Sequence, residues 1–555
     1  MKRTACGCVL GLLSIVAAFQ GCVKPDDFDP SIIARYQREM AEYSPSRRLG
    51  GRTDPGVLEP AAREGLAPLR VEEIKDADGK VVRRVIRLSL EEAIVRTLAG
   101  SPAIQLVSFD PAISREDMVQ AAAAFDVVVF GTTSYAKSDN KRYATALRPI
   151  TDERNFNVGL RQLLPTGTRW EMTWGATREW DNAQTLTSPT KFEPTVGLQV
   201  TQPLLRGGWL DFNLGRLRIA RLAYKSQMQA FRSEVEGAIT NVYRLYWQLH
   251  QAVKELEIQK SLVIWSVETV RVVEGRKGID AGIVQIKQAE SALASHRGTL
   301  VRLEKLIYDV QEQLGVLLGD PQINSLGKFE IIPTTPFVDG PVVINVADQL
   351  AAALKHNPTL AQGRLAVQAA GVQIKVAKND LLPRLDLTAS AGLQGMAGSG
   401  HVAGRELISG DYPSYTIGLE FEYPLGNRDK NSLLRARRLD RSKAIANFQQ
   451  SADQIAASVK ERVRQIGMTL KTLAYQRLAV AAYKAELDGL EILQKTRRGG
   501  MDPEFLELKL RSRERLSEAE RAELQALVDY NSALIELRRI TGTVLDLPGL
   551  KVSLP

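Results

Sequence analysis

Cysteine is nearly absent from this sequence of 555 residues, and its absence excludes several kinds of site. The only three cysteines are Cys6, Cys8 and Cys22. The rest of the chain therefore has no cysteine for a disulfide framework or a thiolate metal site. Histidine is almost as rare, and the only four are His250, His296, His356 and His401. None has a second ligand at metal-binding spacing, so we interpret them as surface or packing residues and expect no metal, no cofactor and no enzymatic activity.

Long hydrophobic runs are also missing, apart from one at the start. Lys2 and Arg3 precede an apolar segment from Val9 to Phe19, the order typical of a secretory signal peptide. The segment is too short for a membrane-spanning helix. With 44% hydrophobic and 25% charged residues, the remainder cannot hold a polytopic helical membrane protein. We therefore expect an exported protein, and its net charge of +9, interleaved with acids, does not favour nucleic acid as a partner.

The end of the signal segment, residues 1–22, predicts a lipid anchor. Gly21-Cys22 resembles the lipobox of bacterial lipoproteins, whose cysteine is acylated. Phe19 stands where leucine is usual, so ordinary signal-peptide cleavage nearby is the alternative. Residues 23–87 are typical of an extended leader, with a small hairpin turning at Asp78-Gly79.

Two very long helices are predicted, each followed by a returning helix. The first covers residues 212–274, roughly 95 Å at 1.5 Å per residue, and the second covers 428–497, roughly 105 Å. The returning helices are expected at 280–318 and 502–540. Apolar residues of the first helix follow a heptad spacing that is typical of a coiled coil, and they are Val235, Ile239, Val242, Tyr246, Leu249, Val253 and Leu256. We expect two long helical hairpins.

Other segments alternate with a period of two, which indicates strands. Residues 384–393 and 415–423 place apolar side chains on one face and polar ones on the other. Their length suits a tilted membrane-spanning strand, and aromatic residues lie near their ends. Less regular candidates lie within residues 125–203, namely 125–136, 155–163, 168–176 and 195–201.

The elements occur twice in the same order, which predicts a tandem duplication. The first repeat covers 88–320 and the second covers 344–541, which opens with a helix at 344–380. A linker, 321–343, joins them, and a tail, 542–555, follows. Pro102 and Pro203 are 101 positions apart, whereas Pro358 and Pro424 are 66 apart, so the first copy has 35 extra residues. This surplus equals about one hairpin, which we assign to Asn155–Ala176.

The duplicated order resembles the TolC-type outer-membrane efflux family over residues 88–542. The resemblance depends on the Leu-x-Leu-x-x-Ala opening at Leu88, on Leu382-Pro-Arg-Leu-Asp-Leu, on Pro-Leu before each long helix, and on paired Gly-x-Asp turns. It implies a mainly α fold with membrane β-strands, in which a homotrimer forms an α-helical barrel continuous with an outer-membrane β-barrel. The family usually has four strands per subunit, so the extra hairpin departs from its pattern.

The resemblance implies an exit duct in the outer membrane that extends into the periplasm. It would conduct passively in a tripartite efflux or type I secretion system, with a periplasmic adaptor and an inner-membrane pump as partners. The alternative is a non-transporting, lipid-anchored periplasmic coiled-coil scaffold. Clean alternation in 384–393 and 415–423 argues against a scaffold, which has no use for lipid-facing strands.

Two groups of residues are candidate sites. In the family, the turns between long and returning helices meet the adaptor, and here these tips comprise Gly275, Arg276, Lys277, Gly278, Asp280, Arg498, Gly500 and Asp502. Ordinary turn chemistry is the simpler explanation for any single one of these residues, so the hypothesis of an adaptor contact is made for the tips as a patch. Glu420 and Glu422 share the polar face of a strand, so we expect them to face the lumen and favour cations, or only to solvate the wall. Residues 395–404 are interpreted as a flexible extracellular loop, because the glycines lack a phosphate-loop ending.

Overall fold

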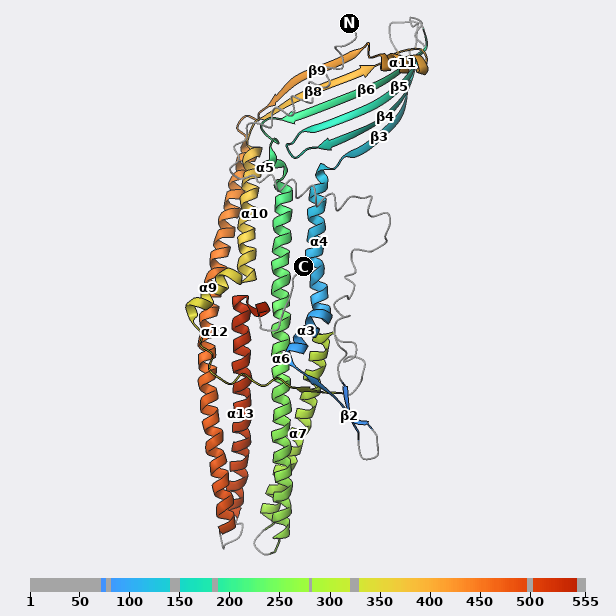
Figure 1. The fold of residues 1–555 in the computed structure, drawn as a ribbon. Helices are drawn as coiled ribbons and strands as arrows, with labels where there is room; N and C mark the ends of the chain where they lie inside the picture. The colour runs from blue at the N-terminus through green and yellow to red at the C-terminus, as the bar shows by residue number, and fades with distance from the viewer. Residues whose placement is uncertain are drawn as a thin grey trace. The chain divides into compact units, whose positions relative to one another are not determined.

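A computed structural model describes residues 71–75, 81–139, 150–181, 188–278, 282–319, 329–496 and 503–546. All of them belong to one compact unit, residues 62–555. Long helices and one large sheet dominate this part of the chain (Figure 1). Within the described ranges, no helix combines the length and the apolar character needed to cross a bilayer.

The two long helical hairpins are present. The first consists of α6 (Gly215–Gly275) and α7 (Ile283–Leu318), and the short helix α5 (Leu210–Asn213) precedes it. The second consists of α12 (Arg428–Thr496) and α13 (Pro503–Thr541). Their bounds lie within a few residues of those that the heptad pattern predicts. Figure 1 shows each returning helix beside its long partner.

Shorter helices open each half of the chain, and each pair is broken at a proline. The first pair is α3 (Leu90–Gly100) and α4 (Pro102–Ala122), and the second is α9 (Val346–His356) and α10 (Pro358–Asp380). The helix predicted at 344–380 is therefore two helices. The residue before each proline is extended, with ψ near 120°, because the proline ring disfavours a helical residue in front of it.

A left-handed glycine at the end of each returning helix packs against one of these breaks. Gly319 has φ of +61°, and a Cβ there would collide with the carbonyl of Gly100. Gly542 has φ of +69°, and a Cβ there would lie 2.5 Å from the carbonyl oxygen of His356. The side chain of Asn357 also donates to the carbonyl of Ile540 at 2.8 Å. The end of each half therefore closes on its own beginning.

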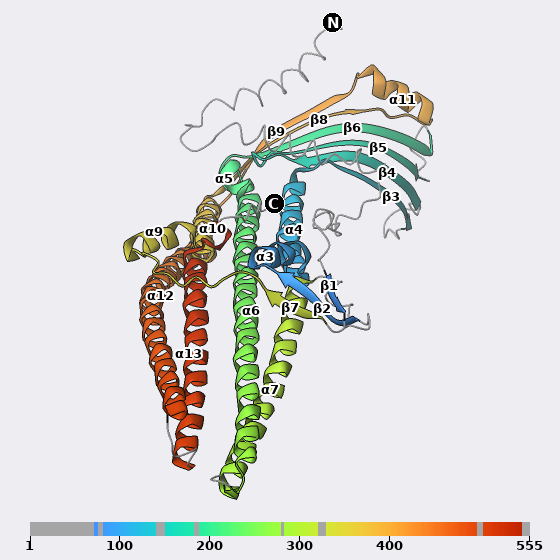
Figure 2. The same cartoon turned by 60° about the horizontal axis from the view of Figure 1, so that its bottom comes forward.

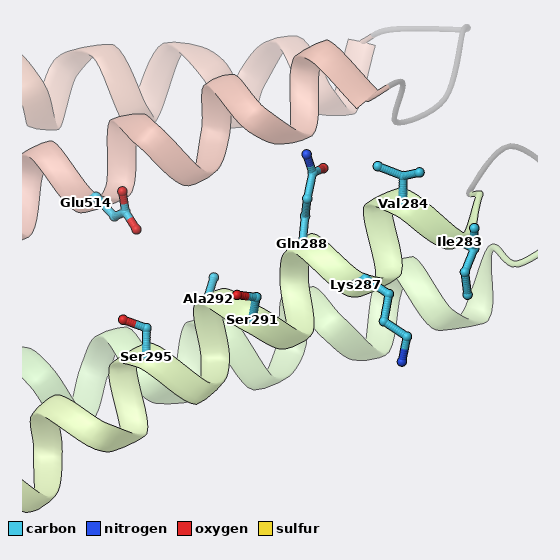
Figure 3. Close-up of a pocket in the computed structure, with 8 residues that line it drawn as sticks. All are labelled: Ile283, Val284, Lys287, Gln288, Ser291, Ala292, Ser295 and Glu514. Atoms are coloured by element: carbon cyan, nitrogen blue, oxygen red, sulfur yellow. The ribbon is translucent and has the colours of Figure 1, made fainter.

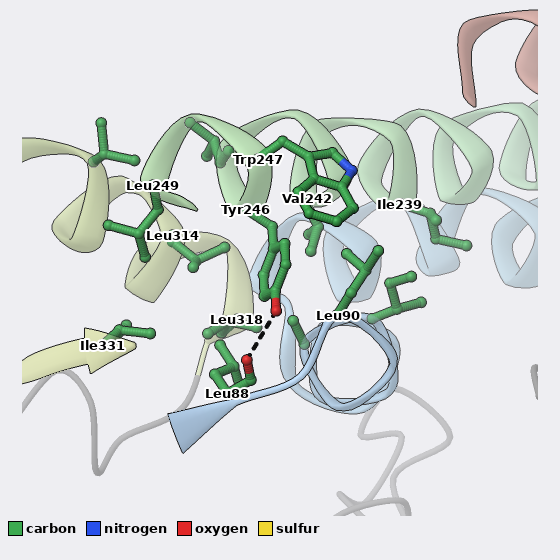
Figure 4. Close-up of a cluster of buried hydrophobic side chains, with 14 of the residues drawn as sticks. Leu88, Leu90, Ile239, Val242, Tyr246, Trp247, Leu249, Leu314, Leu318 and Ile331 are labelled. Carbon is green, nitrogen blue, oxygen red and sulfur yellow. Dashed lines mark hydrogen bonds between the residues drawn. The ribbon is translucent and has the colours of Figure 1, made fainter. Parts of the chain in front are cut away.

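The largest core lies around the middle of α6. Six of the seven heptad residues are buried, and Val253 packs against them from its edge. Tyr246 lies at the centre, and its hydroxyl donates to the carbonyl of Leu88 at 3.0 Å (Figure 4). The Tyr246 hydroxyl oxygen also accepts hydrogen bonds from the backbone N–H groups of Thr334 at 3.0 Å and Thr335 at 2.9 Å. One buried side chain thus links three distant segments.

Two paired strands flank the predicted turn at Asp78-Gly79, which lies outside the described residues, and a third strand joins them. β1 (Val71–Lys75) pairs antiparallel with β2 (Val81–Leu88), and β2 pairs parallel with β7 (Glu330–Pro333). The predicted linker 321–343 therefore contributes a strand to this sheet. Its apolar residue Ile331 is buried against the α6 core. This three-stranded sheet fastens the chain between the halves to the first hairpin.

The larger sheet has six strands, and every neighbouring pair is antiparallel. Its order is β3-β4-β5-β6-β8-β9, and the strands are β3 (Val128–Asp139), β4 (Ile150–Leu163), β5 (Arg169–Asp181), β6 (Thr190–Pro203), β8 (Arg384–Gln394) and β9 (Pro413–Glu422). The extra hairpin, β4 and β5, therefore lies inside the sheet. The strand ends that lead to α4, α5, α10 and α12 all lie at the same end of the sheet (Figure 2).

The prediction of a flexible loop at residues 395–404 is wrong. A helix, α11 (Gly400–Ser409), occupies half of this segment, and Ala403 is buried beneath it. Gly395 allows the helix backbone to approach the sheet, because a Cβ at this position would collide with the carbonyl of Ala403. The glycines therefore serve close packing as well as turning.

Candidate functional site

The six-stranded sheet has one face with a broad apolar area, and charged residues such as Arg154 and Arg178 lie on that face only toward the end remote from the long helices. Strand register places Leu160, Met172 and Leu198 side by side on β4, β5 and β6, and Ala391 and Tyr415 continue the row on β8 and β9. Twelve large apolar side chains on this face are exposed, with exposed fractions from 37% to 81%. The residues are Val129, Tyr135, Phe156, Leu160, Met172, Trp174, Leu198, Leu393, Tyr415, Ile417, Leu419 and Phe421. A continuous apolar surface of this size marks a site of interaction with protein or membrane.

The opposite face of the same sheet is polar. Register aligns one row from β3 to β6, and its members are Ser134, Asn155, Thr177 and Glu193. A second row nearer the helices contains Arg161, Glu171, Gln199, Ser390 and Thr416. The sheet thus separates an apolar surface from a hydrophilic one across a single layer of backbone.

Glu420 and Glu422 lie on this polar face, as the alternation predicts, but they are not isolated charges. The Arg384 guanidinium is 3.2 Å from a Glu420 oxygen and 3.5 Å from a Glu422 oxygen. Arg384 also contacts Asp386 at 2.7 Å, and Arg206 lies 3.8 Å from Glu422. Sequence alternation could place these carboxylates on a face, but only the register of β8 with β9 brings Arg384 opposite them.

The outer strands of the sheet leave two edges. Among the described strands, β3 pairs only with β4 and β9 pairs only with β8. An edge exposes backbone N–H and C=O groups that need hydrogen-bond partners. The sheet by itself is therefore an open element.

The first helix tip is a tight, exposed turn. α6 ends at Gly275, and the N–H of Lys277 donates to the carbonyl of Glu274 at 3.1 Å. Gly278 has φ of +85°, a backbone conformation that favours glycine. No atom lies within 4 Å of a Cβ built at Gly275 or Gly278, so both face open space. Arg276 is half-buried, and Lys277 is exposed. Asp280, Arg498, Gly500 and Asp502, like Cys22, lie outside the described residues.

A small apolar cluster connects the two hairpins just behind the tips. It contains Val273 of α6, Ile286 of α7, Leu490 of α12, and Phe505 and Leu506 of α13. Beside it, a groove of about 710 Å³ opens between α7 and α13 (Figure 3). Ile283 and Val284 line one end, and Glu514 faces Ser295 at the other. The sequence gives no direct signal for this groove, because it depends on the spacing between two separate hairpins.

The helical part contains buried titratable groups but no arrangement typical of catalysis. Burial lowers the pKa of His250 below its usual value, and the ring stacks against Trp247 and lies 4.4 Å from Phe337. Burial likewise lowers the pKa of His296. Over the described ranges, His, Cys, Asp and Glu form no cluster able to hold a metal ion. These histidines act as packing residues in the helical core.

Comparison with known proteins finds one family that matches part of the chain. The family model described as outer membrane efflux protein matches residues 350–543. Over 313 residues, the chain is 23% identical to the outer membrane protein TolC of Escherichia coli K12. That match covers 54% of this chain and 60% of TolC, so the chain spans less than two thirds of this relative's length.

Solved structures of outer-membrane channels share the fold. The outer-membrane channel OprN superimposes with a TM-score of 0.61 at 16% identity, covering 82% of this chain and 90% of OprN. The CmeC outer membrane channel of Campylobacter jejuni gives a TM-score of 0.59 at 14% identity, covering 82% of this chain and 85% of CmeC. The resemblance expected from the duplicated motifs is confirmed.

Proposed function

We propose that this chain is an outer membrane efflux protein and that it forms a passive exit duct whose wall is the six-stranded sheet. The apolar face would meet lipid and the polar face would line an aqueous lumen. The observation that carries the proposal is the register, which gathers large apolar side chains from all six strands on one face and mostly polar side chains on the other. The duct needs no catalytic residues, since a pump in the inner membrane would supply the work.

The spacing of aromatic residues supports a membrane position for the sheet. Trp170 and Trp180 lie on the apolar face of β5, near its two ends. Ten residues of strand span roughly 33 Å at about 3.3 Å per residue. A tilt of about 40° reduces this to a height of roughly 25 Å, which matches the apolar band of outer-membrane barrels. Phe421 near the helix end of β9 and Tyr415 near the far end repeat the arrangement.

Closure of the sheet into a barrel requires further copies of the chain. The two edges, β3 and β9, would have to lie in lipid, where backbone groups find no water as a partner. Pairing β9 of one copy with β3 of the next would satisfy both edges and close a ring. We propose a homotrimer, as the family resemblance implies, so that three six-stranded sheets would form a wall of 18 strands.

The helical hairpins would continue this duct into the periplasm. Each of the four strand ends at the helix edge runs into α4, α5, α10 or α12, so the wall and the helices are covalently continuous. Exposed apolar residues along these helices, such as Tyr475 and Leu478 of α12, would pack against neighbouring copies. Acylation of Cys22 would add an anchor in the membrane.

We further propose that the helix tips contact a periplasmic adaptor. The first tip supports this, since Gly275, Lys277 and Gly278 are exposed and face open space. Replacing Gly278 and Gly500 by valine would change both turns, so we expect crosslinking to the adaptor and export to be lost while trimers persist. Replacing exposed Ser409, at the opposite end of the molecule, is the control. Crosslinking and export at unchanged levels in the double variant would reject the assignment.

Conductance is the direct test of the duct. Purified protein added to a planar lipid bilayer should give discrete steps of current, and its trimer should migrate differently on gels before and after heating. A scaffold that only bridges the envelope would give neither signal. If the protein stays monomeric and leaves the bilayer silent, the proposal fails.

A further inference from the structure

The connection between β8 and β9 is longer than its geometry requires. These two strands are antiparallel neighbours, and a two-residue turn would be enough to join them. β8 ends at Gln394 and β9 begins at Pro413, and α11 (Gly400–Ser409) lies between them. Figure 2 shows α11 at the end of the sheet that is remote from the long helices.

α11 lies on the apolar face of the sheet. The N–H of Gly395 donates to the carbonyl of Pro194 at 3.1 Å, which extends the pairing of β8 with β6 by one position. Leu393 is on the apolar face of the sheet, so a side chain at position 395, two residues later, would lie on the same face. A Cβ on Gly395 would collide with the Ala403 carbonyl of α11. Phe192 on the same face approaches Gly400, whose Cβ would lie 3.6 Å from the ring.

The outer side of α11 exposes apolar residues beside polar ones, among them His401. Ile408 is 86% exposed, and Val402 is exposed to 40%. Arg405 is exposed as well. It lies between Val402 and Ile408 on one side of the helix, because residues three apart on a helix share a side. Tyr412, just after the helix, is 63% exposed. The opposite side, with Ala403 buried, packs against the sheet.

We propose that α11 is an interfacial helix that rests on lipid of the outer leaflet. The inference depends on the proposed function, because the medium that covers the apolar face of the sheet would also surround a helix lying on that face. The distance of α11 from the long helices places it at the outer leaflet. Ile408 and Val402 would enter the upper acyl chains, and Arg405 would reach the headgroup phosphates. The helix would thereby fix how deeply the wall sits in the bilayer.

Depth-dependent quenching of a fluorophore tests this position. Single cysteines replace Ile408, Ile417 or Thr416 in a full-length chain carrying Cys6→Ser, Cys8→Ser and Cys22→Ser, and each is labelled with an environment-sensitive dye. The protein is reconstituted in phosphatidylethanolamine–phosphatidylglycerol vesicles that contain a nitroxide either near the headgroup or deep in the acyl chain. Ile417 lies on the apolar face in mid-strand, and Thr416 lies on the polar face, so they are matched controls.

Position 408 should be quenched about twofold more by the shallow nitroxide than by the deep one, since interfacial helices lie only about 5–10 Å into the bilayer. Position 417 should favour the deep nitroxide, and position 416 should respond to neither. Quenching at 417 without quenching at 408 would overturn the role of α11 and leave the duct intact. If the emission of the dye at position 408 is blue-shifted but neither nitroxide quenches it, protein covers the helix, and this result would also overturn the inference. Absence of quenching at 417 would reject the membrane wall itself, and α11 with it.

Discussion

Removing the hairpin β4–β5 should narrow the barrel without opening it. The change deletes residues 140–189 and joins Asp139 of β3 to Thr190 of β6 through Asn-Gly, a pair suited to a two-residue hairpin turn. Register puts Asp139 and Thr190 on the same face of the sheet. Direct pairing of β3 with β6 therefore keeps every apolar side chain on its side. The deletion leaves four strands per copy and preserves antiparallel order.

The expected change in diameter follows from strand spacing. Neighbouring strands lie about 4.8 Å apart, and with a tilt of about 40° each strand occupies roughly 6.3 Å of the barrel circumference. Eighteen strands then give a backbone diameter of about 36 Å, and 12 strands give about 24 Å. The long helices remain intact in the deletion variant, so the trimer should persist.

Electron cryomicroscopy of trimers in nanodiscs measures this width directly. A variant shortened only in residues 182–187 keeps all six strands and is the control, and it should match the intact protein. If the intact protein already has a barrel near 24 Å wide, the hairpin does not belong to the closed wall. Equal widths for the intact and deleted proteins would refute the reasoning in the same way.

Three further perturbations test the helical core and the lumen. Tyr246→Phe should cost about 1–3 kcal/mol, because it leaves the half-buried backbone N–H of Thr335 without its acceptor, whereas the N–H of Thr334 keeps the carbonyl of Leu88; faster amide exchange at residue 335 is the readout, and unchanged exchange contradicts the role of the hydroxyl. The pKa of His250 is lower in the folded protein than its usual 6.5, so the unfolded chain binds the proton more readily and stability should fall as pH drops below about 6.5. His250→Phe should flatten that decline in unfolding experiments, and an identical pH profile would count against it. Glu420→Gln with Glu422→Gln should turn weak cation preference into anion preference in a salt gradient, since the cluster of two guanidinium and three carboxylate groups changes from −1 to +1; an unmoved reversal potential would show that these side chains only solvate the wall.

Sequence periodicity predicted the main elements because burial imposes it. The heptad of α6 lies in the largest core, with Tyr246 and Leu249 fully buried, since a coiled-coil seam must face a partner. Residues 384–393 match β8 almost to the residue, because a strand with two different environments alternates strictly. The weaker alternation of the first copy was enough to find β3 to β6, although β4, β5 and β6 are longer than predicted and β3 begins three residues later, because a short 3-10 helix covers Ala123–Phe125.

Features that depend on contacts between distant segments were beyond the reach of periodicity. The position of β4 and β5 inside the sheet is set by their pairing with β3 and β6. The 35 extra residues alone could equally have formed a hairpin outside the sheet. α11 was missed because its glycines suggested a loop, whereas Gly395 and Gly400 permit close packing on β8 and Phe192. The pairing of Arg384 with Glu420 likewise depends on strand register, which alternation alone leaves open.

The closure of each half on its own beginning has a consequence for biogenesis. Gly319 meets Gly100, and Gly542 meets His356, so these contacts join positions roughly 200 residues apart in the chain. Contacts this distant are slow to form, because the intervening chain must lose its freedom first. An exported chain cannot complete either half until its last helix has crossed the inner membrane. Nascent copies would therefore wait in the periplasm with their apolar stripes uncovered, and we expect their maturation to require protection from aggregation until the C-terminal helix arrives.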